Sequence, residues 1–162
     1  MGKPLLVYRF AISLFAAVES IRALRRGGPG LLRARFGLAD GGSDAPHVWL
    51  HGASNGELAS IRPVLERLLD ERPDLHWLIT CNSATGRAMV ERWGLPRVIA
   101  RDAPLDLAWI TGRFMRRWHV VAHISLETEI WPHRMRLCPG PVLQLGARMS
   151  AKTARGWARF PG

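Results

Sequence analysis

The sequence has few of the residues that cross-link small domains or bind metals. Its 162 residues include two cysteines, Cys81 and Cys138, which lie far apart and have no second cysteine or histidine at zinc-ligand spacing. This argues against a disulfide framework and a structural zinc site. We therefore expect a reducing compartment and no bound metal, with Cys81 as a small core residue within an apolar run.

Long apolar runs are also missing. The apolar segment at residues 5–18 is interrupted by an arginine and is shorter than the roughly 20 residues that span a bilayer. No convincing signal-peptide cleavage site follows it. Because Arg22, Arg25 and Arg26 come next, we expect residues 1–26 to form a membrane-associated helix in the bilayer interface. The alternative is a helix packed on its own domain.

Nucleotide-binding motifs are absent as well. The chain contains neither GxGxxG nor GxxxxGK[ST], so no dinucleotide fingerprint or P-loop is indicated. We do not expect Ser54 to act as a nucleophile. The sequence also contains no internal repeat or low-complexity tract.

Acidic residues are scarce relative to basic ones. The chain has 23 Lys plus Arg against 13 Asp plus Glu, a formal net charge of +10, and lysine occurs only at positions 3 and 152. This balance favours nucleic acid, a phosphorylated sugar or an anionic membrane surface as a neighbour, although a GC-rich genome alone also enriches arginine. We expect no nucleic-acid partner, because the tryptophans fall within core patterns and no reader motif is present.

Hydrophobic patterning predicts the fold class. Apolar residues make up 48% of the chain, which is usual for a folded domain. Residues 27–46, which begin with GGPG, are predicted to form a linker. Over residues 47–162, short apolar runs alternate with helical periodicity, which predicts an α/β fold: a Rossmann-like parallel sheet with helices on both faces. The strands are expected at 47–51, 76–81, 97–100, 120–125 and 141–145, and Pro63 is expected to kink or restart the helix after the first strand.

Polar residues gather where these strands end, which is where ligands bind in such sheets. Glu57 and Glu127 follow different strands, and we expect them to share one cleft, an arrangement suited to general base catalysis. Gly52 and Gly56 allow a tight turn that places Glu57 in the first turn of a helix, where the dipole favours a carboxylate. A purely structural role at the helix start is the alternative. The other polar residues of these loops are Ser54, Asn55, Thr80, Asn82, Ser83, Thr85, Asp102, Asp106, Glu129, Arg148 and Ser150.

Five blocks of sequence resemble, in order and separation, the signatures of the N-terminal acceptor-binding domain of 3-deoxy-D-manno-octulosonic acid (Kdo) transferases. They are WLHGASNGE (49–57), TCNSATG (80–86), APLD (103–106), ETEIWP (127–132) and ARMS (147–150). The resemblance implies a GT-B glycosyltransferase, inverting and metal-independent, on the cytoplasmic face of the inner membrane. Such an enzyme transfers Kdo from CMP-Kdo to the lipid A precursor during lipopolysaccharide synthesis.

The same resemblance implies roles for individual residues. Glu57 would be the catalytic base that deprotonates the acceptor hydroxyl, and Glu127 would stabilise the transition state. No cofactor is implied. Contacts to the acceptor are expected from Ser54, Asn55, Thr85, Glu129 and Arg148, with Arg35 and Arg87 as weaker candidates for its phosphates.

The resemblance further implies a second domain, which binds CMP-Kdo and would follow residue 162. We therefore expect the chain alone to bind acceptor but hardly to catalyse transfer. It would be a fragment of a longer protein, a half completed by a separate C-terminal donor-binding domain, or a degenerate remnant. The alternative function is a non-catalytic, membrane-associated acceptor-binding or scaffold module.

Overall fold

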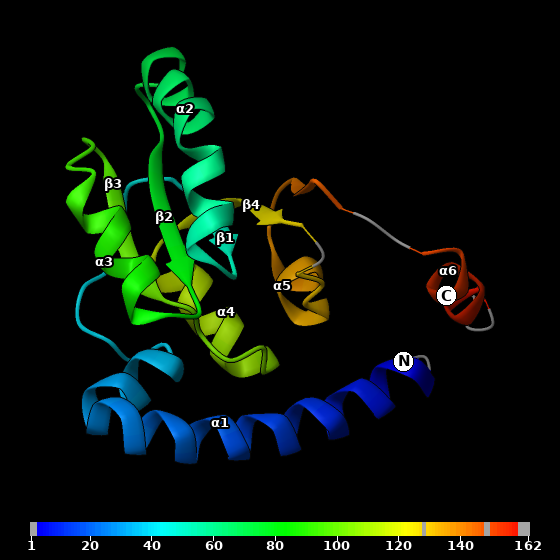
Figure 1. Ribbon diagram of the computed structural model, residues 1–162. Helices are drawn as coiled ribbons and strands as arrows, with labels where there is room; N and C mark the ends of the chain where they lie inside the picture. Colours follow the sequence, from blue (N-terminus) through cyan, green and yellow to red (C-terminus); the bar gives the residue numbers. More distant parts are fainter. Residues whose placement is uncertain (1–2, 128, 148–149, 159–162) are drawn as a thin grey trace.

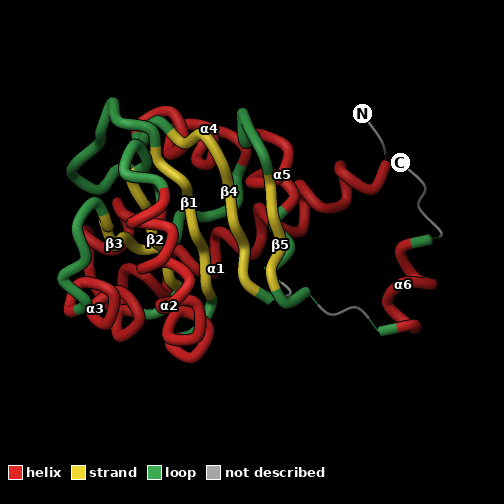
Figure 2. Tube along the Cα trace, turned by 90° about the horizontal axis from the view of Figure 1, so that it is seen from above, coloured by secondary structure: helices red, strands yellow, loops and turns green. Residues whose placement is uncertain are grey.

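A sheet of five parallel strands forms the centre of the molecule (Figures 1 and 2). The computed structural model describes residues 3–127, 129–147 and 150–158. The strands lie in the order β3-β2-β1-β4-β5, and every neighbouring pair is parallel. This confirms the predicted α/β fold, with strands close to their expected positions. They are β1 (His47–Gly52), β2 (His76–Cys81), β3 (Val98–Asp102), β4 (Val120–Leu126) and β5 (Val142–Leu145).

Helices cover both faces of this sheet. Successive side chains of a strand point to opposite faces, so Leu50 of β1 packs beneath α2 and α3, whereas Trp49 packs with Phe114 of α4. All six residues of β1 are buried, as expected for a central strand of a parallel sheet. The helices are α1 (Lys3–Arg35), α2 (Asn55–Glu71), α3 (Ala84–Arg92), α4 (Ala108–Arg117), α5 (Pro132–Leu137) and α6 (Ala151–Trp157).

The first helix is longer than the sequence suggested. Residues 27–46 were expected to form a linker, but α1 continues to Arg35. The GGPG segment does bend it, because Gly28 has φ 63° and ψ −160° within α1, a conformation that glycine adopts without a Cβ penalty. The division of the chain into segments at residues 26 and 46 stays a prediction.

Helix α1 packs on the domain through one face and exposes apolar side chains on the other. Ile12, Ala16 and Ala23 are buried, and the Tyr8 hydroxyl donates a 2.6 Å hydrogen bond to Asp106. Figure 1 shows α1 running alongside α4. Within the described ranges, no helix has the length and apolarity needed to cross a bilayer. The exposed apolar residues of α1 are Leu6, Val7, Phe10, Leu14, Phe15, Val18, Ile21 and Leu24.

Helix α2 continues through an interior proline. The structure shows one helix from Asn55 to Glu71 that includes Pro63, so the helix does not restart there. Proline removes one backbone hydrogen bond and crowds the preceding turn. Leu58 and Leu65, on either side of it, are 0% and 1% exposed, and this apolar burial offsets the cost.

Candidate active site

A pocket lies where the strand order reverses. Strands β2 and β3 lie on one side of β1, and β4 and β5 lie on the other. Ligands bind at such a switch point, beyond the carboxyl ends of the strands. The pocket there, which we call the acid pocket, has a volume of about 440 Å³. Both candidate acids therefore border one cavity, which is lined by Glu57, Ser60, Ile61, Leu126, Glu127, Leu145 and Gly146.

Glu57 is held at the start of α2 by reciprocal hydrogen bonds. Its backbone N–H donates to Ser54 Oγ over 3.2 Å, and its carboxylate accepts from the Ser54 hydroxyl at 2.9 Å and from the Ala53 N–H at 2.8 Å. This arrangement resembles a capping box, so Glu57 does have the structural role that was the alternative. The same bonds fix the orientation of its carboxylate at the edge of the acid pocket, which is the preorganisation that a catalytic group needs.

The turn before α2 also spells G-A-S-N-G at residues 52–56, which fits the letters of the GxSxG nucleophile motif. Ser54 is instead the N-cap of α2, and within the described residues its hydroxyl is bonded to Glu57 rather than to a histidine. Gly52 leaves room for Leu58, because a Cβ there would lie 2.8 Å from Leu58 Cδ2. A Cβ on Gly56 would meet its nearest atom at 3.9 Å. Ser54 therefore caps α2 and positions Glu57, and the expectation that it is not a nucleophile stays a prediction.

Glu127 also lines the acid pocket, and its backbone is strained. Its φ is 53°, and the left-handed conformation costs a non-glycine residue roughly 1–2 kcal/mol. The Glu127 N–H donates to Leu145 O at 2.7 Å, and the Gln144 side chain donates to Glu127 O at 2.6 Å. Strain that is held in place in this way is typical of functional positions.

The polar residues of the first two loops form a separate cluster beside the acid pocket. Asn55 lies 3.3 Å from the Thr85 hydroxyl and accepts a 3.2 Å hydrogen bond from Ser83. Neither Asn55 nor Thr85 lines the acid pocket. Gly86 allows this close approach, because a Cβ there would lie 3.0 Å from Asn55 Oδ1 and 2.3 Å from Cys81 Sγ. The remaining acceptor candidate, Arg148, lies outside the described residues.

Glu129 does not line the acid pocket, and its carboxylate contacts His51 and Trp131 instead. Its carboxylate accepts from Trp131 Nε1 at 2.7 Å and lies 3.3 Å from His51 Nε2. Thr80 accepts from Trp49 Nε1 at 2.8 Å and lies 2.9 Å from His51 Nδ1. Because an ionised carboxylate can only accept, the contact with Glu129 assigns the proton of His51 to Nε2, and the Thr80 hydroxyl then donates to Nδ1. The hydrogen bond to His51 lowers the pKa of Glu129. The acceptor-binding role of Glu129 stays a prediction.

Three other polar residues of the loops are structural rather than part of the acid pocket. Thr80 and Asp106 are 0% and 2% exposed, and Asp106 accepts the hydrogen bond from Tyr8. Asp102 is also buried and pairs with Arg87 at 2.5 Å. These residues do lie at or near the carboxyl ends of the strands, as predicted. Because they are buried, they stabilise the fold and do not face the acid pocket.

Buried histidines make stability depend on pH. Burial, followed by the charge of Arg134, lowers the pKa of His51 to about 4 and that of His123 to about 3. Both are neutral in the folded protein, so the unfolded chain, with a histidine pKa of about 6.5, binds more protons below that value. We expect the free energy of unfolding to fall by about 1.4 kcal/mol per pH unit for each histidine as the pH drops from about 6.5 towards 4.

Urea unfolding across this pH range measures the effect. His123→Asn keeps a donor for the 2.9 Å contact to Trp49 O. It should reduce the pH dependence of the free energy of unfolding by the contribution of one proton, about 1.4 kcal/mol per pH unit. A free energy of unfolding that stays constant between about pH 6.5 and 5 would contradict the assignment of two buried neutral histidines.

Comparison with known proteins identifies the family. The sequence profile of the family described as 3-deoxy-D-manno-octulosonic-acid transferase (kdotransferase) matches residues 31–162. The chain belongs to the Kdo transferase family. It is 30% identical over 114 residues to a probable mitochondrial Kdo transferase of Arabidopsis thaliana, a match that covers 68% of this chain and 26% of that protein.

Bacterial Kdo transferases match over similar segments. The chain is 29% identical over 134 residues to the Haemophilus influenzae enzyme, covering 80% of this chain and 31% of that protein. It is 27% identical over 117 residues to the Rickettsia prowazekii enzyme, covering 69% and 25%. The chain thus spans between a quarter and a third of the length of these Kdo transferases, and the profile match includes both acids of the acid pocket.

Proposed function

We propose that this chain forms the acceptor side of a glycosyltransferase that transfers Kdo from CMP-Kdo to the lipid A precursor. The observation that supports it is that Glu57 and Glu127 line one pocket at the switch point of the sheet. The reaction would be inverting and metal-independent, within a GT-B enzyme on the cytoplasmic face of the inner membrane. CMP-Kdo would be bound mainly by the part of the relatives that this chain does not cover.

Each acid has a defined task in this proposal. An acceptor hydroxyl attacks the anomeric carbon of Kdo, the bond to CMP breaks, and the hydroxyl proton passes to the Glu57 carboxylate. Glu127, which also lines the acid pocket, stabilises the positive charge that develops on the sugar. The bonds from Ala53 and Ser54 hold Glu57 in place, so little reorganisation accompanies proton transfer.

The exposed apolar face of α1 supports a location at the membrane surface. Phe10 and Leu14 are 79% and 64% exposed, and Arg22, Arg25 and Arg26 follow them on the same helix. Such a helix lies in the bilayer interface with arginines near anionic head groups. The acyl chains of a lipid acceptor would then stay in the bilayer while its sugar reaches the acid pocket.

Glu127→Gly tests the catalytic role of Glu127 separately from its structural one. Glycine at φ 53° relieves the left-handed strain, so we expect the free energy of unfolding to rise by up to about 1 kcal/mol. Transfer should fall by roughly 10²–10³-fold because the carboxylate is lost. Denaturant unfolding measures the first effect. A Kdo transfer assay measures the second, in a fusion of this chain with the part of the Haemophilus influenzae relative that it does not cover. Glu127→Gln, which keeps the strain, should be equally inactive, and full transfer by either variant would contradict the role.

A further inference from the structure

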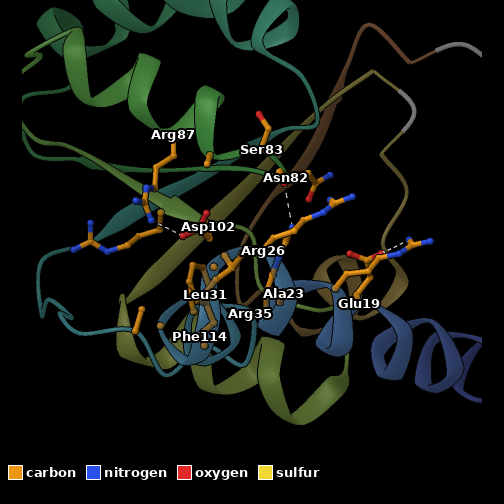
Figure 3. Close-up of a pocket in the computed structure, with 18 of the residues that line it drawn as sticks. Glu19, Ala23, Arg26, Leu31, Arg35, Asn82, Ser83, Arg87, Asp102 and Phe114 are labelled. Carbon is orange, nitrogen blue, oxygen red and sulfur yellow. Dashed lines mark hydrogen bonds and ion pairs between the residues drawn. The ribbon is translucent and has the colours of Figure 1, made fainter.

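A second pocket lies between α1 and the carboxyl ends of β2 and β3 (Figure 3). Its volume is about 640 Å³, and it shares no lining residue with the acid pocket. The charged side chains that line it are two carboxylates, Glu19 and Asp102, and five arginines. We call it the arginine pocket, after Arg22, Arg26, Arg35, Arg87 and Arg101.

Two of the five arginines are paired with carboxylates. Arg22 binds Glu19 at 2.6 Å, and Arg87 binds Asp102 at 2.5 Å. Both carboxylates of the pocket lining are therefore already engaged. Positive charge remains in excess on the other side chains of the lining.

The remaining arginines bind only neutral groups or none. Arg35 donates to the carbonyl oxygens of Ala103 and Asn82, at 2.8 and 3.1 Å. Those bonds orient the guanidinium but do not neutralise it. Arg26 is exposed and makes no hydrogen bond or ion pair with any residue of the described ranges. In Figure 3, Arg26 and Arg35 extend from α1 towards the loop at Asn82 and Ser83.

Arg101 adds to the positive potential of the arginine pocket. Its guanidinium lies over the Trp118 ring, 5.0 Å from the centroid. Burial, followed by repulsion from Arg87, lowers the pKa of Arg101. A cation held close to another cation is stabilised when an anion binds between them.

The start of α3 faces the same space. Ser83 is the N-cap of α3 and Ala84 is its first residue, and both line the arginine pocket. A helix N-terminus carries a partial positive charge and free N–H groups, which suit phosphate oxygens. The pocket thus combines guanidinium groups, which bind phosphate through paired N–H donors, with a helix start.

The position of the pocket on α1 indicates where its ligand comes from. Ile21 and Leu24 of α1 are 54% and 50% exposed, and they alternate along the helix with the pocket residues Arg22, Ala23 and Arg26. Apolar side chains directly beside arginines are typical of a surface that meets lipid head groups.

We propose that the arginine pocket binds a phosphate mono- or diester through Arg26, Arg35 and the N-terminus of α3, and that a membrane lipid head group supplies it. The site is separate from the acid pocket, so this proposal does not depend on the transfer reaction. Its test measures binding alone.

The first experiment titrates the 162-residue chain with inorganic phosphate and follows the backbone amide NMR signals of Ser83 and Ala84. We expect saturable shifts, and Arg26→Gln should weaken the apparent affinity about tenfold, the effect of losing one charge-assisted hydrogen bond. Arg25→Gln is the matched control, because Arg25 is exposed on the same helix but does not line the pocket. Shifts that do not saturate, or equal weakening by both variants, would overturn the proposal.

The second experiment identifies the source of the phosphate. The chain is sedimented with phosphatidylcholine vesicles that either contain or lack phosphatidic acid. Each variant loses one charge near the head groups, so the difference between them reports on the arginine pocket, which Arg26 lines and Arg25 does not. Recruitment that depends on phosphatidic acid, and that is about tenfold weaker in Arg26→Gln than in Arg25→Gln, supports a lipid head group. Equal recruitment of both variants, combined with specific binding of inorganic phosphate, would overturn the lipid source and assign the pocket to a soluble phosphate.

Discussion

Glu57→Gln is expected to lower the rate constant of Kdo transfer by roughly 10²–10⁴-fold, the usual contribution of a general base. The assay uses a fusion of this chain with the part of the Haemophilus influenzae relative that it does not cover. Glutamine cannot take the acceptor proton, but its carbonyl oxygen can still accept from Ala53 N–H or the Ser54 hydroxyl, which bind the carboxylate now. The acid pocket should therefore keep its shape.

A second substitution on the same helix provides the control. Glu66 of α2 is half-buried, does not line the acid pocket and pairs with Arg62 at 2.8 Å, so Glu66→Gln should leave transfer unchanged. If Glu57 only caps the helix, Glu57→Gln, which can keep a capping bond, will leave transfer intact. That outcome would remove Glu57 from the catalytic mechanism.

Asp106→Ala is expected to lower the free energy of unfolding by about 3–5 kcal/mol. The substitution leaves the buried groups that now bond to this carboxylate without their partner. Asp106 is 2% exposed and accepts hydrogen bonds from the Tyr8 hydroxyl at 2.6 Å and from the backbone N–H groups of His133 and Arg134, both at 3.0 Å. Arg134 is itself 2% exposed and would lose its nearby counter-charge. Denaturant unfolding measures the loss.

Tyr8→Phe separates the contribution of α1 from that of α5. Burial and the hydrogen bond to Asp106 raise the pKa of Tyr8, so the hydroxyl stays protonated and donates. Its removal should cost about 1 kcal/mol, while the bonds from His133 and Arg134 remain. A cost below about 1 kcal/mol for Asp106→Ala itself would contradict the view that this carboxylate joins α1 and α5.

Strands were easier to predict from the sequence than the first helix. A central parallel strand is buried on both faces, so the apolar runs of β1 and β2 are visible in the sequence. The GGPG segment indicated a break, whereas Gly28 absorbs a bend at φ 63° and Ala34, beyond it, is buried against the domain. Contacts between residues far apart in the sequence hold this segment in a helix. Local sequence patterns do not reveal such contacts.

The candidate site was predictable where topology alone determines it. The ends of parallel strands meet at one edge of the sheet, which is why Glu57 and Glu127 could be paired from the sequence and do line one pocket. The burial of Asp106 depends on Tyr8 and α5, which the strand-end rule ignores. Arg134, buried 5.0 Å from the rings of Trp49 and Trp131, was missed because an arginine in a short helix usually faces solvent.

The most direct test is Kdo transfer from CMP-Kdo to lipid A precursor by the fusion protein, compared with the uncovered part of the Haemophilus influenzae relative alone. We predict transfer only when this chain is present, and its loss in Glu57→Gln. Binding of the acceptor without transfer, by a fusion that is folded and binds CMP-Kdo, would contradict a catalytic role and leave a non-catalytic acceptor-binding module.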